Sequence, residues 1–122
     1  MTVNEAVARA LENSGADISR HQLCAWLGEI ENTVVQEIAK VHEGMPYDET
    51  VITADTDGER VLFAPDPYSA LYVNYLLMKT DLYLRDTAQY VTSSHVFSVS
   101  YADFADWYNR AYMPYEGAEI RL

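Results

Sequence analysis

Large apolar and aromatic side chains recur at helical spacing through the second half of this chain, between Pro65 and Pro114. This stretch holds eight of the ten tyrosines. Steps of four and three residues, the period of an α-helix, separate one series of its side chains: Tyr90, Ser94, Phe97, Tyr101, Phe104, Tyr108 and Ala111. Such a chain must bury an aromatic helix face, which predicts a bundle of helices.

The same periodicity extends to the first half and predicts a single domain, residues 1–122, of the mainly α class. We expect a helical bundle of about four helices, with the last residues, 115–122, frayed. The expected helices span about 3–13, 20–43, 67–84 and 87–112.

Capping residues stand before three of these helices. Thr2 with Glu5, and Ser19 with Gln22, have the spacing of a capping box. Asp66-Pro67 predicts an N-cap followed by proline in the first helical position of the third helix.

Helical spacing stops between Met45 and Pro65, where acidic residues gather. Two short β-prone runs, 51–53 and 61–63, flank the turn pair Asp57-Gly58, so we expect a short acidic β-hairpin or loop at 47–64. Between positions 43 and 66, seven carboxylates stand against one arginine. The segment thus carries a net charge of −6 out of −11 for the whole chain.

The third and fourth helices carry the less ordinary patterns. The third is apolar on nearly every side, which predicts burial either at the centre of the fold or between subunits. In the fourth, residues 96–101 alternate as a strand would, and Val, Ser and Thr are poor helix formers. We predict one continuous helix, because residues 102–112 are clearly helical and no turn signal separates the two stretches.

Charge and cysteine content narrow the class of protein. With 19 acidic and 8 basic residues, the chain lacks the Lys and Arg clusters that bind nucleic acid or anionic membranes. The single Cys24 excludes an internal disulfide. We find neither a secretion signal nor an apolar run of about 18 residues that would span a membrane. These features predict a protein kept in a reducing cytoplasm.

One segment is similar to part of a calcium-binding loop. Residues 55–58 read Asp-Thr-Asp-Gly, but Thr53 and Ala64 then stand where carboxylate ligands belong. An acidic turn is the better interpretation of these residues.

Other metal patterns also fail on spacing. His21 and Cys24 share a helix face, yet a zinc site needs further ligands, and a buried packing cysteine is the simpler interpretation. No histidine follows a glutamate by three residues, as a di-iron bundle requires. We interpret Glu29, Glu31 and Glu37 as a solvated face. We therefore expect no enzyme activity, no metal and no cofactor.

Without chemistry, the surplus of tyrosine indicates contact surface, since tyrosine buries a ring and keeps a hydroxyl for a partner. Core packing together with a subunit interface explains it better than a ligand pocket or a base-stacking platform. A platform would need a basic groove, and Lys79, Arg85 and Arg110 are too few.

Four segments follow one another in an order that resembles a known family. They are TVNEAVARALE, AWLGEIENTVVQEIAKVHEG, LFAPDPYSALYVNYLLMKTDLYLRDTAQY and FADWYNRAYMP. The most specific pieces are Trp26-Leu27 with His42-Glu43-Gly44, Ala64-Pro65 and Pro67-Tyr68 leading into Tyr72 and Tyr75, and Tyr108-Asn109-Arg110 before Met113-Pro114. Over nearly the whole chain, this order is similar to a small helical head–tail connector or adaptor (head completion) protein of tailed bacteriophages and Gram-positive prophages.

The resemblance implies a virion component without catalysis, present in the host bacterial cytoplasm during assembly. It implies a homo-oligomeric ring that meets phage portal and tail or stopper proteins. DNA would pass through the ring without specific nucleic-acid binding, and no membrane is involved.

On this interpretation the third and fourth helices supply the subunit interface. Its expected residues are Tyr72, Tyr75, Tyr83, Tyr90, Tyr101 and Tyr108. The acidic loop would face the channel, where carboxylates repel DNA phosphates, or a neighbouring ring. Its expected residues are Asp48, Glu49, Asp55, Asp57 and Glu59.

A second class of protein also fits the acidic composition, namely a DNA mimic or inhibitor that occupies a basic site on a partner. That class predicts carboxylates spaced like phosphates along one face. Here they cluster in one loop, which favours the connector.

Overall fold

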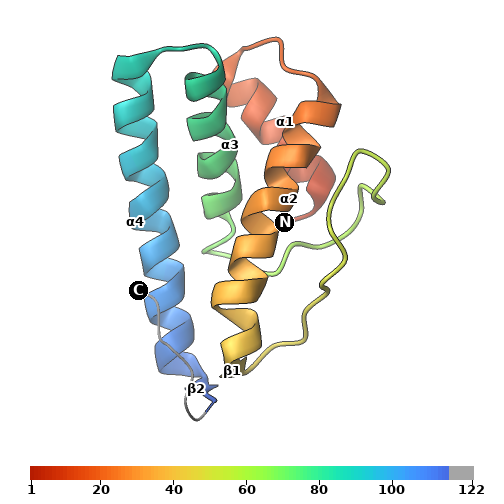
Figure 1. Ribbon diagram of the computed structural model, residues 1–122, viewed down its shortest axis with the longest axis vertical. Helices are drawn as coiled ribbons and strands as arrows, with labels where there is room; N and C mark the ends of the chain where they lie inside the picture. Colours follow the sequence, from red (N-terminus) through yellow and green to blue (C-terminus); the bar gives the residue numbers. More distant parts are fainter. Residues whose placement is uncertain (116–122) are drawn as a thin grey trace.

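The computed structural model describes residues 1–115 and shows the mainly helical fold that the sequence predicts. Within this range four helices pack together (Figure 1): α1 (Val3–Ser14), α2 (Arg20–Glu37), α3 (Ala70–Tyr83) and α4 (Thr87–Ala111). A short 3₁₀ turn, η1 (Ala39–Val41), follows α2. Two-residue strands β1 (His42–Glu43) and β2 (Met113–Pro114) pair antiparallel at one end of the bundle. Of the residues predicted to fray, all but Tyr115 lie outside this range.

The predicted caps of the first two helices are confirmed. Thr2 accepts a hydrogen bond from the Glu5 amide, and the Glu5 carboxylate accepts one from the Thr2 amide, a complete capping box. The Ser19 hydroxyl accepts from the Gln22 amide at 3.1 Å. At its other end, α1 stops at Gly15, whose φ of 63° is a left-handed conformation that glycine adopts readily.

Helix α2 is shorter than predicted, because it ends at Glu37 and not near residue 43. The His42 ring explains this end. Its Nδ1 lies 2.7 Å from the Ile38 carbonyl and replaces the backbone amide that would continue the helix. The chain then leaves the helix through η1 into β1.

Residues 44–69, which we call the strap, connect β1 to α3 as an irregular loop along the outside of α2 (Figure 1). Their backbone pairs with the start of the chain: the Val3 and Asn4 amides donate to the Arg60 and Gly58 carbonyls at 3.0 and 2.9 Å. The loop alternative is therefore confirmed and the hairpin alternative is wrong. The β-prone run at 61–63 finds its partner in residues 1–4 and not in the neighbouring run.

Helix α3 begins at Ala70, later than predicted, and Asp66 does not cap it. The Asp66 carboxylate instead accepts the Ser69 hydroxyl, while the Tyr68 amide donates to the Pro65 carbonyl in a turn. Helix α3 packs against α1, α2 and α4, so of the two predicted places for this helix the centre of the fold is confirmed. It ends in a tight corner at Arg85, whose φ is 57°.

Helix α4 runs without a break through 91–100, as predicted. Serine hydroxyls donate to carbonyls one turn earlier, for example Ser94 to Val91 and Ser98 to Ser94. These bonds satisfy hydroxyls that would otherwise compete with the helix backbone.

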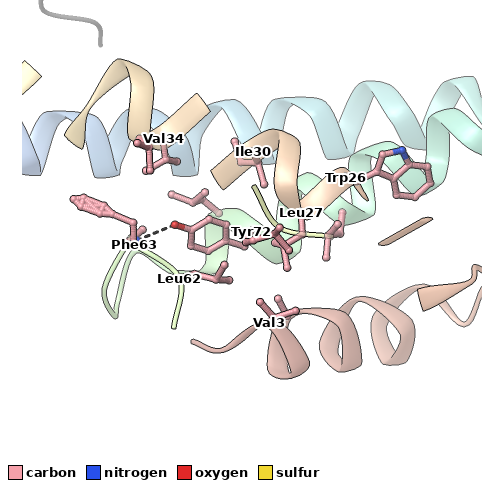
Figure 2. Close-up of a cluster of buried hydrophobic side chains, with 14 of the residues drawn as sticks. Val3, Trp26, Leu27, Ile30, Val34, Leu62, Phe63 and Tyr72 are labelled. Atoms are coloured by element: carbon pink, nitrogen blue, oxygen red, sulfur yellow. Dashed lines mark hydrogen bonds between the residues drawn. The ribbon is translucent and has the colours of Figure 1, made fainter. Parts of the chain in front are cut away.

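The core lies where α1, α2, α3, the second half of α4 and the strap meet, and Figure 2 shows part of it. Val3, Leu27 and Leu62 from three of these elements surround the Tyr72 ring of α3. Trp26 is also buried, with its ring edge-on to Tyr83 at 5.9 Å between centroids.

Candidate assembly surfaces

A buried carboxylate joins three elements of the fold. Glu31 of α2 is only 4% exposed. One of its oxygens accepts the Phe63 amide at 2.8 Å and the other accepts the Tyr72 hydroxyl at 2.7 Å. The same hydroxyl accepts the Ala64 amide at 2.8 Å, and Figure 2 shows it directed at the strap. Helix α2, the strap and α3 are thus tied by one closed network.

Burial dominates the electrostatics of this network. It raises the pKa of Glu31, and the hydrogen bonds from Tyr72 and Phe63 and the charge of Arg60 oppose that rise. The pKa of Tyr72 is also raised, chiefly by burial and then by the adjacent Glu31 charge. Both carboxylate oxygens already have partners, so the network serves to hold the strap and offers no open position for a substrate.

The sequence interpretation of Glu31 as solvated is therefore wrong. Glu31 lies four residues after Leu27 and four before Val35, both buried, so helical spacing placed it on the apolar side of α2. Glu29 is exposed as predicted, while Glu37 is half-buried.

The strap has a second anchor beside this network. Ile52 is buried, and its carbonyl lies so close to Gly28 of α2 that an added Cβ would be 2.5 Å from it. Arg60 donates to the Thr50 carbonyl at 2.7 Å and to the Asp48 carbonyl at 3.3 Å. The strap backbone is therefore held against α2 and does not stand away from the bundle.

The predicted acidic residues of the strap all lie on the surface. They are Asp48, Glu49, Asp55, Asp57 and Glu59. Glu49 meets Lys40 at 2.9 Å and Glu59 accepts from Asn4 at 3.3 Å. The strap is fixed by its apolar and backbone contacts, and its carboxylates face outward.

Two of the tyrosines predicted for a subunit interface are not on the surface. Tyr72 and Tyr108 are 0% exposed, so their assignment to an interface is wrong. Their rings fill the core, and both hydroxyls accept backbone amides, that of Ala64 for Tyr72 and that of Met45 for Tyr108. The helical spacing located an aromatic face correctly, but this part of the face packs inside the chain.

The other four tyrosines of the predicted interface reach the surface to different degrees. Tyr75 and Tyr101 are half-buried and donate to Glu29 and Glu37 at 2.9 and 2.6 Å. Tyr90 is also half-buried, whereas Tyr83 is exposed. Their role between subunits stays a prediction.

Residues far apart in the sequence meet at the end of the bundle where β1 pairs with β2. His42 Nε2 contacts the Asn109 side chain, and the Met45 amide donates to the Tyr108 hydroxyl at 2.9 Å. A Cβ at Gly44 would overlap that hydroxyl, so the close approach requires glycine. The segments 42–44 and 108–110, singled out by the resemblance, therefore form one structural junction.

Exposed apolar side chains gather at the opposite end. Three lie at the corner between α3 and α4: Leu82, Tyr83 and Leu84. Three more lie on the first part of α4: Val91, Val96 and Val99. This end of the molecule is the main apolar surface that the helices present to solvent.

A hollow of about 440 Å³ opens between the end of α1 and the α3–α4 corner. Polar side chains such as Asn13 and Asp81 line it together with apolar ones such as Leu77, Leu84 and Val96. Among the described residues that line it, none is a cysteine or a histidine.

Metal and membrane features are not found in the part of the chain that the structure describes. Residues 1–115 contain no group of three or more His, Cys, Asp or Glu side chains placed to hold a metal ion. Cys24 is buried, and burial raises the pKa of its thiol, so it packs as a small apolar side chain. No helix between residues 1 and 115 has both the length and the apolar character needed to cross a bilayer.

Comparison with protein-family models, curated proteins and solved structures finds no match to this chain.

Proposed function

We propose that this chain is a non-enzymatic structural protein of a tailed phage or prophage, a head–tail connector or adaptor that forms a ring joining portal to tail. The observation that carries the proposal is the separation of two surfaces. Apolar side chains lie exposed at the α3–α4 corner, while the strap on the other flank of the bundle carries exposed carboxylates, with Tyr47, Val51 and Val61 exposed among them (Figure 1).

A ring subunit needs both kinds of surface. Repeated head-to-tail contacts require apolar area on each subunit, and the Leu82–Leu84 corner supplies it. A channel that conducts DNA must repel phosphate, and the strap supplies carboxylates held in fixed positions by Glu31 and Ile52. The corner with Tyr83 and Tyr90 is therefore our candidate ring interface.

The resemblance to connector proteins indicates which assembly the ring would belong to. Its specific residues Trp26, Tyr72 and Tyr108 are buried, so what they would share with connector proteins is the way the helices pack. The virion location, and the portal and tail or stopper proteins as partners, rest on this resemblance.

The test is assembly with the portal protein encoded in the same phage or prophage genome. We expect native mass spectrometry to show a ring of this chain on the portal, and Tyr83→Glu to prevent it. Ala25→Glu, at an exposed position on α2, adds the same charge elsewhere and should leave the ring intact. A chain that stays monomeric and binds neither portal nor tail proteins would refute the proposal.

An acidic inhibitor or DNA mimic is the second candidate, and the outward carboxylates of the strap favour it. Such a protein would bind a basic nucleic-acid-binding protein through Asp48, Glu49, Asp55, Asp57 or Glu59. A pull-down from the host lysate, compared with one on purified portal, separates the two candidates. Capture of a nuclease that strap carboxylate-to-amide variants abolish would favour the inhibitor.

A further inference from the structure

The first part of α4 is an exposed helix without charge. Residues 87–102 contain no Asp, Glu, Lys or Arg, although these make up 22% of the chain. None of the residues from Thr87 to Tyr101 is buried. A surface helix in so acidic a protein normally carries charge on its solvent face, so this stretch departs from the rest of the molecule.

The outward side of this stretch is also apolar. Val91 and Val99 are 63% and 47% exposed, and Val96, which is 46% exposed, lies at the edge of this side, where it borders the hollow beside α1. The inward side carries the aromatic residues, with the Phe97 ring edge-on to Tyr75 of α3 at 5.1 Å. Helix α3 covers that inner side, and α4 forms one flank of the bundle (Figure 1). The outward side has no neighbour within the part of the chain that the structure describes.

The outward side repeats its residue types symmetrically about His95. Equal distances before and after His95 hold an alanine pair, a valine pair and a hydroxyl pair: Ala88 and Ala102, Val91 and Val99, Thr92 and Ser98. Two such helices running antiparallel with a two-fold axis at His95 would place each member of these three pairs opposite its like, while Val96 would face Ser94. A two-fold interface has this property, since the same patch meets itself.

The symmetry about His95 makes a second copy the best occupant of this face, and the absence of charged residues from the face permits it. Each chain carries −11, so two copies repel one another unless the surfaces in contact are neutral. In the antiparallel arrangement the start of one α4, at Thr87, would lie opposite Asp103 of the other copy. The Asp86 carboxylate already caps that helix start by accepting the Gln89 amide, so the two carboxylates repel at the edges of the pair and limit its strength.

We propose that two copies of this chain pair through the 87–102 face of α4, with the helices antiparallel about a two-fold axis at His95. This closed pair is distinct from the head-to-tail contacts of a ring and does not depend on the connector proposal. The helix stretch is about 24 Å long and roughly 10 Å wide, which is well below the ~800 Å² per partner of a stable complex. The pair is therefore weak and forms at high protein concentration.

Cysteine cross-linking tests the register. The His95→Cys variant should form a disulfide dimer by itself, because both copies of position 95 lie on the axis. Val99→Cys should not, since two copies of position 99 would be about 12 Å apart along the helices. Mixing Val91→Cys with Val99→Cys should restore cross-linking. The unmodified chain is the control for Cys24, which is buried.

Sedimentation velocity over a range of protein concentrations measures the dissociation constant of the pair. Val99→Glu should raise the dissociation constant at least tenfold, and Val91→Lys added to it should restore pairing, because each lysine would face a glutamate. Ala25→Glu on α2 should leave the constant unchanged, and circular dichroism should show all variants folded. The proposal fails if the chain is monomeric at every concentration and His95→Cys does not cross-link. It also fails if Val99→Glu has no effect, or if Val99→Cys alone cross-links as fast as His95→Cys.

Failure of this test leaves the connector proposal standing, because its ring is assigned to the Leu82–Leu84 corner and to the half-buried Tyr90, and not to the outward side of α4. Failure of the portal experiment likewise leaves the α4 pair intact.

Discussion

The two halves of α4 have the same inward aromatic spacing but different surroundings. In the second half, Phe104, Ala105 and Tyr108 are buried among rings from the strap and from α4 itself, including Phe63 and Tyr68. In the first half, nothing from Thr87 to Tyr101 is buried. Helical period therefore decides which side of a helix faces inward, but neighbouring elements decide whether that side is enclosed.

The outward sides of the two halves of α4 differ in charge. Asp103, Asp106 and Arg110 face solvent in the second half, with Asp106 and Arg110 paired at 3.1 Å. The first half carries exposed valines instead. Where the chain already surrounds the helix, its outer side is charged. Where the chain leaves the helix partly open, its outer side is neutral, which suits contact with another molecule.

The largest expected effect is in the enclosed half. Phe104→Ala removes a fully buried ring and should lower the free energy of unfolding by about 3–5 kcal/mol. Phe97→Ala, the matched change in the open half, should cost clearly less because Phe97 is only partly buried. Urea unfolding of both variants measures the difference. Equal losses would mean that the two halves are equally enclosed, contrary to the comparison.

Trp26 tests how far the packed core extends toward the open end. Its ring is buried and lies against Tyr83 at the corner. Trp26→Ala should cost about 3–5 kcal/mol, toward the lower part of that range because one edge contacts an exposed side chain. Thermal unfolding followed by circular dichroism measures it. An unchanged melting temperature would place Trp26 outside the core and enlarge the open region.

Glu31 tests the strap, which supplies Phe63 to the enclosed half. Glu31→Gln replaces one of the two carboxylate oxygens with an amide NH₂ group, so that either the Phe63 amide or the Tyr72 hydroxyl loses its acceptor. The substitution should lower the free energy of unfolding by about 1–3 kcal/mol at neutral pH. The folded pKa of Glu31 is raised by burial. The contribution of Glu31 to the free energy of unfolding therefore increases as the pH falls through the folded pKa toward the pKa of the unfolded chain, about 4.3.

The variant cannot take up this proton. The stability gap between the original chain and Glu31→Gln should accordingly widen as the pH is lowered from neutral toward 5. Denaturant unfolding at several pH values measures the gap. If the two plots of unfolding free energy against pH stay parallel, burial does not raise the pKa of Glu31.

The smallest effect is expected on the outward side of the open half. Val91→Ala should change the free energy of unfolding by less than about 0.5 kcal/mol, because the side chain is 63% exposed. The same urea measurements cover this variant. A loss of more than about 1 kcal/mol would reveal an intramolecular partner for this side and remove the contrast between the halves.

The sequence predicted much of the fold from local signals. The capping residues Thr2 and Ser19 and the unbroken α4 follow from bonds within a few residues, and the structure confirms them. The early end of α2 was not predictable in this way, since the His42 ring takes the place of a backbone donor. The late start of α3 was missed because the Asp66 side chain bonds to Ser69 and not to the helix backbone.

The sequence predicted less of the surfaces. It located the acidic strap and the aromatic side of α3 and α4. It could not tell that Tyr72 and Tyr108 are enclosed while Tyr83 is open, because that depends on the strap crossing one end of the bundle. The position of Glu31 in the helical series of α2 was a signal for its burial, but the donors that stabilise it come from residues 63 and 72.

By itself, the sequence determined the helical class of this protein, its acidic strap and the neutral stretch at 87–102, because period, charge and composition are local properties. Only the tertiary structure decided which tyrosines form the core, which carboxylate is buried and which part of α4 is left open. Each of those outcomes depends on contacts between residues far apart in the chain, and a buried polar group such as Glu31 is tolerated only where such contacts supply its hydrogen bonds.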